Sequence, residues 1–110
     1  MLGALFGSGV PTVSAEKLAE MLRQKDTAPV VVDVRTPAEF AQAHIAGARL
    51  VPLAQLGQQI GKLPRDQPLV TVCRSGHRSL MAARQLKRAG FQVTNLSGGM
   101  LAWKGPTATT

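Results

Sequence analysis

The chain has 110 residues, 45% of them hydrophobic, with one cysteine and a net charge of +7. This length fits one domain, the hydrophobic content excludes a disordered chain, and one cysteine excludes both an internal disulfide and a thiolate-rich metal site. The positive charge fits a solvated basic surface or attraction of small anions; nucleic-acid binding is disfavoured, because the thirteen Lys and Arg residues are scattered and three Phe and one Trp are the whole aromatic content.

Residues 1–9 are expected to form a flexible leader outside the fold. The apolar run in it, from Leu2 to Phe6, is too short for a signal peptide or for a membrane span. We therefore expect a cytoplasmic protein for which membrane association is disfavoured. The globular domain is placed at residues 10–105, and residues 106–110 are expected to be a C-terminal tail.

In the first half of the chain, helix-start signals alternate with strand-like runs. A helix is predicted over residues 14–24, because the serine at its start can cap it. The β-branched run at 30–34 predicts a central parallel strand. A capping box with proline at the first helical position predicts a short helix over 36–42. A strand at 48–51 and a short helix over 53–60 follow.

The second half continues the alternation. A buried strand at 69–72 precedes a loop, and a helix over 80–89 follows, ended by Gly90 in a position suited to a C-terminal cap. A strand at 91–96 then leads through a tight turn at 97–99 into a last helix. Alternating strands and helices predict an α/β fold whose sheet is covered on both faces, and in such sheets functional sites lie at the carboxyl ends of strands.

The single cysteine, Cys73, stands between a predicted strand and a predicted helix in a short basic loop. Backbone N–H groups of a tight loop and the N-terminus of the next helix stabilise an anion. Arg74 and Arg78 add positive charge, so we expect the pKa of the thiol to be lowered by about one unit or more. Such a thiol is a nucleophile; the alternative is a small core residue at a strand end.

The other loop residues each have a structural interpretation beside a functional one. Gly76 fits a position that needs a positive φ or a close backbone approach, and Ser79 can cap the following helix with its hydroxyl. Arg78 can fold back to hold the loop carbonyls together, or it can remain a solvated charge. His77 either takes part in the site or only lines its rim.

With these motifs the chain resembles the rhodanese-domain sulfurtransferases, from about Val10 to Trp103. The matching segments are Val31 to Phe40, His44 to Ala48, Cys73 to Ser79, and Leu96 to Gly99. The resemblance implies a rhodanese-like domain over residues 10–105, with a three-layer α/β/α architecture and a central, mostly parallel five-stranded sheet.

The resemblance also implies an activity. In rhodaneses the loop cysteine takes the outer sulfur of thiosulfate or another sulfane donor, becomes a persulfide, and passes the sulfur to cyanide or a thiol. Cys73 would then be the nucleophile. Substrate binding would fall to the rest of the loop, namely Arg74, Ser75, Gly76, His77, Arg78 and Ser79. No metal and no organic cofactor are implied.

Two further segments match the family near the loop. Asp33 and Arg35 correspond to its Asp-x-Arg sequence, and we expect them to form a scaffold for the site, with Arg35 paired to Glu39 one helical turn away. Gly98 and Gly99 would let another part of the backbone approach the loop.

Loop length distinguishes sulfur transfer from related chemistries. Four residues separate Cys73 from Arg78, whereas related phosphatases and arsenate reductases have five, which widens the loop for a tetrahedral oxyanion. Sulfur transfer is therefore favoured, with a phosphatase or arsenate reductase, or a sulfur-relay module that binds a protein partner, as alternatives. The charged loop favours thiosulfate over 3-mercaptopyruvate as donor. Because the chain has no second cysteine, the acceptor must be external: cyanide, glutathione or a thioredoxin-like protein thiol.

Overall fold

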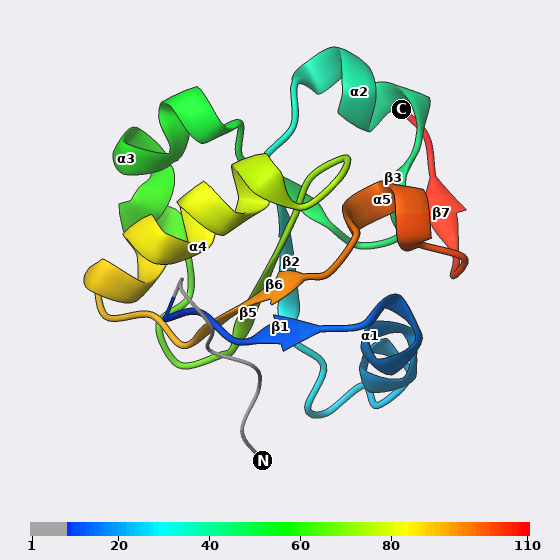
Figure 1. Ribbon diagram of the computed structural model, residues 1–110, viewed down its shortest axis with the longest axis horizontal. Helices are drawn as coiled ribbons and strands as arrows, with labels where there is room; N and C mark the ends of the chain where they lie inside the picture. The colour runs from blue at the N-terminus through cyan, green and yellow to red at the C-terminus, as the bar shows by residue number, and fades with distance from the viewer. Residues whose placement is uncertain (1–8) are drawn as a thin grey trace.

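The computed structural model describes residues 9–110, so the expected leader lies outside the described residues except for Gly9. A five-stranded parallel sheet in the order β1-β6-β5-β2-β4 forms the centre (Figure 1). Its strands are β1 (Thr12–Val13), β2 (Val30–Asp33), β4 (Arg49–Leu50), β5 (Leu69–Val72) and β6 (Val93–Leu96). The predicted α/β class with a parallel five-stranded sheet is confirmed.

Helices cover both faces of this sheet (Figure 1). The helices of the described residues are α1 (Ala15–Leu22), α2 (Pro37–Gln42), α3 (Leu56–Gln59), α4 (His77–Arg88) and α5 (Gly99–Ala102), with 3-10 turns at Leu53–Gln55 and Ile60–Lys62; α2 lies beyond the strand ends. The predicted N-terminal signals of the first two are confirmed: Ser14 Oγ accepts from the N–H of Lys17 at 3.1 Å, and α2 has the capping box. Within residues 9–110, no helix is long and apolar enough to cross a membrane.

The core consists of two apolar layers, one on each face of the sheet. Successive strand residues point to opposite faces, so neighbours on a strand enter different layers. On β2, Val31 packs in the layer that includes Leu18 of α1, whereas Val32 packs in the layer that includes Leu86 of α4. Because both faces are covered, the ends of the strands are the part of the sheet open to a ligand.

A second, two-stranded sheet involves the C-terminal residues. β3 (His44–Ile45) pairs antiparallel with β7 (Thr107–Ala108), and the N–H of Thr110 donates to the carbonyl of Ala41 at 3.1 Å. The segment 106–110, expected to be a tail, therefore carries a strand. Strands of two residues have no periodicity that a sequence could reveal, and their pairing depends on partners more than 60 residues away.

Candidate active site

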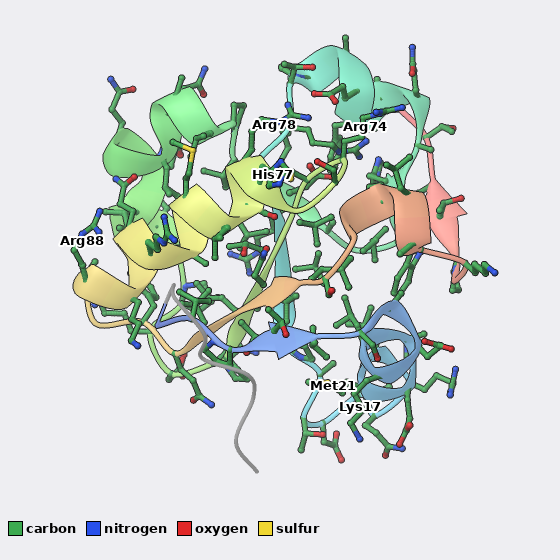
Figure 2. All side chains as sticks on the ribbon, in the orientation of Figure 1. Lys17, Met21, Arg74, His77, Arg78 and Arg88 are labelled. Atoms are coloured by element: carbon green, nitrogen blue, oxygen red, sulfur yellow. The ribbon has the colours of Figure 1, made fainter. Side chains whose placement is uncertain are left out.

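The residues predicted for the site lie at the carboxyl ends of three adjacent strands. Cys73 directly follows β5, the middle strand of the sheet, with Arg35 beyond β2 on one side and the 97–99 turn after β6 on the other. Figure 2 shows Arg74, His77 and Arg78 at the turn between β5 and α4. The arrangement brings a nearly buried thiol, 1% exposed, under a rim of basic side chains.

The loop is shaped so that its backbone surrounds the sulfur. Gly76 has a φ of 110°, which confirms the predicted need for positive φ, and its N–H donates to Cys73 Sγ at 3.1 Å. A residue with a Cβ is strained in this conformation, so glycine allows the turn that aims the amide at the sulfur. α4 begins at the next residue, His77.

The pKa of the Cys73 thiol lies below its ordinary value, as predicted. Burial is the largest single influence and by itself raises this pKa. The hydroxyl and N–H of Ser79, together with the N–H groups of Gly76 and Ser75, more than offset burial, because they stabilise the thiolate as hydrogen-bond donors. These hydrogen-bond donors therefore stabilise the thiolate form of Cys73, which is the nucleophilic one.

The predicted helix cap at Ser79 is wrong. α4 begins three residues before the predicted start, its N-cap is Gly76, and no side chain caps it. Ser79 is therefore inside the first turn, where its buried hydroxyl has no hydrogen-bond partner of normal geometry among the described residues. That hydroxyl nevertheless helps lower the pKa of Cys73. The hydroxyl is therefore a buried donor close enough to influence the thiol, although no hydrogen bond between the two is formed in this structure.

The start of α5 packs directly on the loop, as the two glycines predicted. The N–H groups of Met100 and Leu101 donate to the carbonyls of Cys73 and Arg74 at 2.8 and 3.1 Å. Gly99, with a φ of 57°, comes so close that a Cβ there would lie 2.4 Å from the carbonyl oxygen of Cys73. The approach of α5 therefore requires glycine at this position, and it fixes the loop from the side opposite α4.

Arg78 is paired with a carboxylate from another helix. Its guanidinium donates to both oxygens of Glu39 on α2, at 2.7 and 2.9 Å. The expected pair between Arg35 and Glu39 is therefore wrong. Arg78, for which both a contact with the loop carbonyls and a solvated position were considered, is instead held by this carboxylate. The bidentate pair instead joins α2 to the first turn of α4 and holds the pKa of Glu39 at about 2.

Acid should weaken the fold through this pair. The pKa of Glu39 is about 2 in the folded chain against an ordinary 4.5, so its ionised form favours the folded state. The contribution is complete above pH 4.5 and is lost as pH falls toward 2; after allowance for solvent screening it amounts to about 1–2 kcal/mol. Urea unfolding of wild type and Glu39→Gln across this range should show the stability difference shrinking as pH falls.

A matched control is the exposed helical pair of Lys17 and Glu20, whose closest atoms are 3.6 Å apart. Exposed pairs of this kind contribute little to stability, so Glu20→Gln should leave the curve of stability against pH close to wild type. A constant difference between wild type and Glu39→Gln over the whole acid range would contradict the assigned pair.

Asp33 and Arg35 pair with each other at the end of β2. The Arg35 guanidinium donates to both oxygens of Asp33, at 2.8 and 2.9 Å, and to the carbonyl of Ala43 at 2.7 Å. Both side chains are buried. The pair therefore joins the end of β2 to the segment after α2, the helix that carries Glu39.

One polar contact to the loop was not predicted from the sequence. Asn95 on β6 is buried and donates from Nδ2 to the carbonyl of Gly76 at 3.2 Å, and Thr71 on β5 donates to Asn95 Oδ1 at 3.2 Å. The available signal was three polar residues, Thr71, Thr94 and Asn95, inside two strands that are otherwise apolar. Within residues 9–110, no group of three or more His, Cys, Asp or Glu side chains is placed to hold a metal ion.

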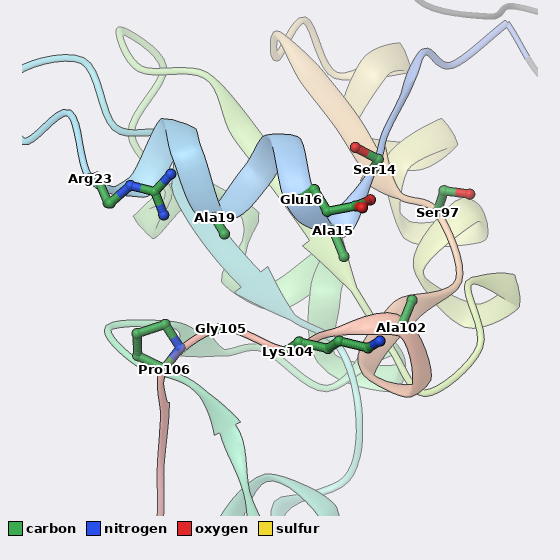
Figure 3. A pocket seen from close by; sticks show the side chains of 10 residues that line it. All are labelled: Ser14, Ala15, Glu16, Ala19, Arg23, Ser97, Ala102, Lys104, Gly105 and Pro106. Carbon is green, nitrogen blue, oxygen red and sulfur yellow. The ribbon is translucent and has the colours of Figure 1, made fainter.

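A hollow beside α1 does not include the thiol. It has a volume of about 570 Å³ and lies between α1 and the segment 104–106, with Glu16, Arg23 and Lys104 among its lining residues (Figure 3). Its lining contains no residue of the 73–79 loop. The hollow is therefore separate from the thiol and its loop.

Comparison with known proteins agrees with this geometry. The family model described as a rhodanese-like domain matches residues 14–106. A sulfurtransferase from Allochromatium vinosum is 37% identical over 95 residues, which cover 86% of this chain and 88% of that protein. A putative sulfur carrier protein from Bacillus subtilis, YrkF, is 35% identical over 91% of this chain but only 54% of its own length. The crystal structure of a rhodanese-related protein from Thermoplasma volcanium superposes with a TM-score of 0.83 at 27% identity, covering 90% of this chain and 98% of that one.

Proposed function

The chain belongs to the rhodanese-like domain family, and on that basis we propose that it transfers sulfur from thiosulfate through a persulfide on Cys73 to an external acceptor. The observation that carries the proposal is the set of hydrogen-bond donors around Cys73 Sγ. The Gly76 nitrogen lies 3.1 Å from this sulfur, and the Ser79 hydroxyl helps to lower the pKa of the thiol. A thiolate held by amides suits a sulfur atom that bears negative charge before and after transfer.

The reaction consists of two displacements. The Cys73 thiolate attacks the outer sulfur of thiosulfate; a bond from Cys73 to that sulfur forms, the bond between the two sulfurs of thiosulfate breaks, and its electron pair leaves with sulfite. An acceptor anion then attacks the outer sulfur of the persulfide, and the electron pair of the broken bond returns to Cys73 as thiolate. Cyanide becomes thiocyanate, a thiol becomes a persulfide, and no other oxidant or reductant is needed.

The charges of the loop support a dianionic donor. Because Arg78 is engaged by Glu39, we assign attraction of the donor mainly to Arg74 and His77, which are exposed at the rim. The amides of Ser75 and Gly76 are assigned to the transferred sulfur. In this assignment Asp33 and Arg35 support the site without contacting the donor.

The acceptor has to come from outside the chain, which has one cysteine. Cyanide, glutathione and a thioredoxin-like thiol all fit the chemistry. A role as sulfur-relay module, in which one protein partner receives the sulfur, is the second candidate. Its support is the similarity to a relative named as a putative sulfur carrier. Comparing sulfur-transfer rates at equal acceptor concentration separates the two, because a relay module should prefer its protein acceptor strongly over cyanide.

Intact mass after incubation with thiosulfate tests the proposal directly. We expect the protein to gain one sulfur atom, and we expect cyanide or dithiothreitol to remove it. The same experiment with 3-mercaptopyruvate ranks the donors, and thiosulfate should load faster because the rim is basic. Folded protein that gains no sulfur from either donor would refute the proposed function.

Phosphatase or arsenate reductase activity is the disfavoured alternative, because the loop has four residues between Cys73 and Arg78. Hydrolysis of an aryl phosphate should be undetectable beside sulfur transfer measured on the same preparation. A phosphatase rate that exceeds the sulfur-transfer rate would reverse this order.

A further inference from the structure

The reactive loop is held from inside the sheet by a buried amide. Asn95 is 5% exposed, and its Nδ2 donates to the carbonyl of Gly76 at 3.2 Å. Its Oδ1 accepts from Thr71 Oγ1 at 3.2 Å, and Thr71 is its register partner on the neighbouring strand. Buried polar groups are normally hydrogen-bonded. Here the Thr71 hydroxyl satisfies the amide oxygen of Asn95, and the amide nitrogen of Asn95 binds the loop carbonyl.

The carbonyl that Asn95 binds belongs to the same residue whose N–H binds the sulfur. Gly76 donates to Cys73 Sγ at 3.1 Å, while its carbonyl accepts from Asn95 and from the N–H of Leu80 at 3.1 Å. Glycine at a φ of 110° has no Cβ to restrict its backbone rotation. Hydrogen bonds to the Gly76 carbonyl therefore help to hold this flexible residue in the conformation that places its N–H on the sulfur.

We propose that Asn95, itself oriented by Thr71, is a positioning residue that holds the Gly76 N–H on the Cys73 sulfur. It acts through the Gly76 carbonyl and not on the reacting atoms. The proposal depends on the proposed function only in taking Cys73 as the reacting thiol. Removing the amide should let the Gly76 peptide groups turn away, so that the thiolate loses part of its stabilisation.

The test measures the pKa of Cys73 directly from the ultraviolet absorbance of the thiolate as pH is raised. The chain suits this measurement, because it has one cysteine and no tyrosine. In Asn95→Leu the midpoint should rise by about half a pH unit or more, since one donor to the thiolate is lost. In Thr71→Val, which keeps the amide but not the hydroxyl that orients it, the rise should be smaller and in the same direction.

Thr94→Val is the matched control for Thr71→Val. Thr94 lies next to Asn95 on β6 and is only partly buried, and its variant likewise exchanges a hydroxyl for a methyl group. Its midpoint should equal that of wild type. The charged groups of the elements around the loop are the same in every variant: Asp33, Arg35, Glu39, Arg74, His77 and Arg78.

The double variant tests whether Thr71 acts through the amide. In the Asn95→Leu background, Thr71→Val should cause no further rise, because the group that it orients is gone. A midpoint that is unchanged in folded Asn95→Leu, with cooperative unfolding as the check of folding, would overturn the proposal. If Asn95→Leu does not fold, an unchanged midpoint in Thr71→Val overturns it instead.

These outcomes are independent of the proposed sulfur transfer. The midpoint is measured without thiosulfate, so it does not depend on sulfur transfer. If wild type gains no sulfur but Asn95→Leu still raises the midpoint, the proposed function is refuted and the positioning role stands. A protein that gains sulfur but shows no shift in Asn95→Leu keeps the function and loses the positioning role.

Discussion

Replacing Cys73 by serine is expected to abolish sulfur transfer and to leave the fold intact. The transferred sulfur must bond to a thiolate, and a serine hydroxyl is neither ionised near neutral pH nor able to form a persulfide. Turnover should fall by about a thousandfold or more, to the background rate, as is usual when a covalent nucleophile is removed. Thiocyanate formation from thiosulfate and cyanide measures the loss, and intact mass should show no added sulfur.

Folding of Cys73→Ser should survive because the new hydroxyl can still accept from the Gly76 N–H, which donates to the sulfur in wild type. The cost should stay near 1 kcal/mol in urea unfolding, within the range for replacing a small buried side chain. Ser75→Ala, which keeps the thiol, the Ser75 N–H and the loop length, is the matched control and should retain most of the activity. Turnover in Cys73→Ser close to the wild-type rate would show that the thiol is not the nucleophile.

Gly99→Ala is expected to have the largest effect on stability. A Cβ at this position would lie 2.4 Å from the carbonyl oxygen of Cys73 and 2.5 Å from that of Arg74, and backbone atoms cannot move aside as a flexible side chain can. Relieving the clash requires α5 to move away, which breaks the hydrogen bonds from Met100 and Leu101 to those carbonyls. We expect a loss of about 3–5 kcal/mol in urea unfolding, together with slower persulfide formation.

Gly47→Ala separates the clash from backbone strain. Gly47 has a φ of 85° and nothing within 4 Å of a Cβ built on it, so alanine there meets the positive φ alone. Its cost should be about 1 kcal/mol, with normal persulfide formation. Equal losses of stability in the two variants would mean that the contact between α5 and the loop does not constrain Gly99.

Local patterns were sufficient to predict the reactive loop. The apolar run that ends at Cys73, the glycine that needs positive φ and the capping box at Thr36 are each defined by residues within one helical turn or one strand of each other. Interactions over such short distances are present in the sequence itself. The position of Cys73 at a strand end and the direction of its pKa shift could therefore be predicted without a structure.

The pairing of the charged side chains could not be predicted from the sequence, because it depends on how the helices pack. Glu39 is one turn away from Arg35 in sequence and 39 residues from Arg78, yet it pairs with Arg78. Arg35 instead forms its ion pair with Asp33, which is two residues away and also buried at the strand end. Sequence spacing alone could not rank these partners, since α2 and α4 come together only because the strands that precede them, β2 and β5, pair side by side in the sheet.

The sequence by itself determined which thiol is the candidate nucleophile and what kind of loop surrounds it, because strand ends, helix starts and glycine turns are local properties of the backbone. The tertiary structure alone decided how that loop is held: by α5 through Gly99, by α2 through Glu39, and by β6 through Asn95. Each of these contacts joins segments at least 19 residues apart in the chain. They form only when the parallel strands align and place their carboxyl ends at one edge.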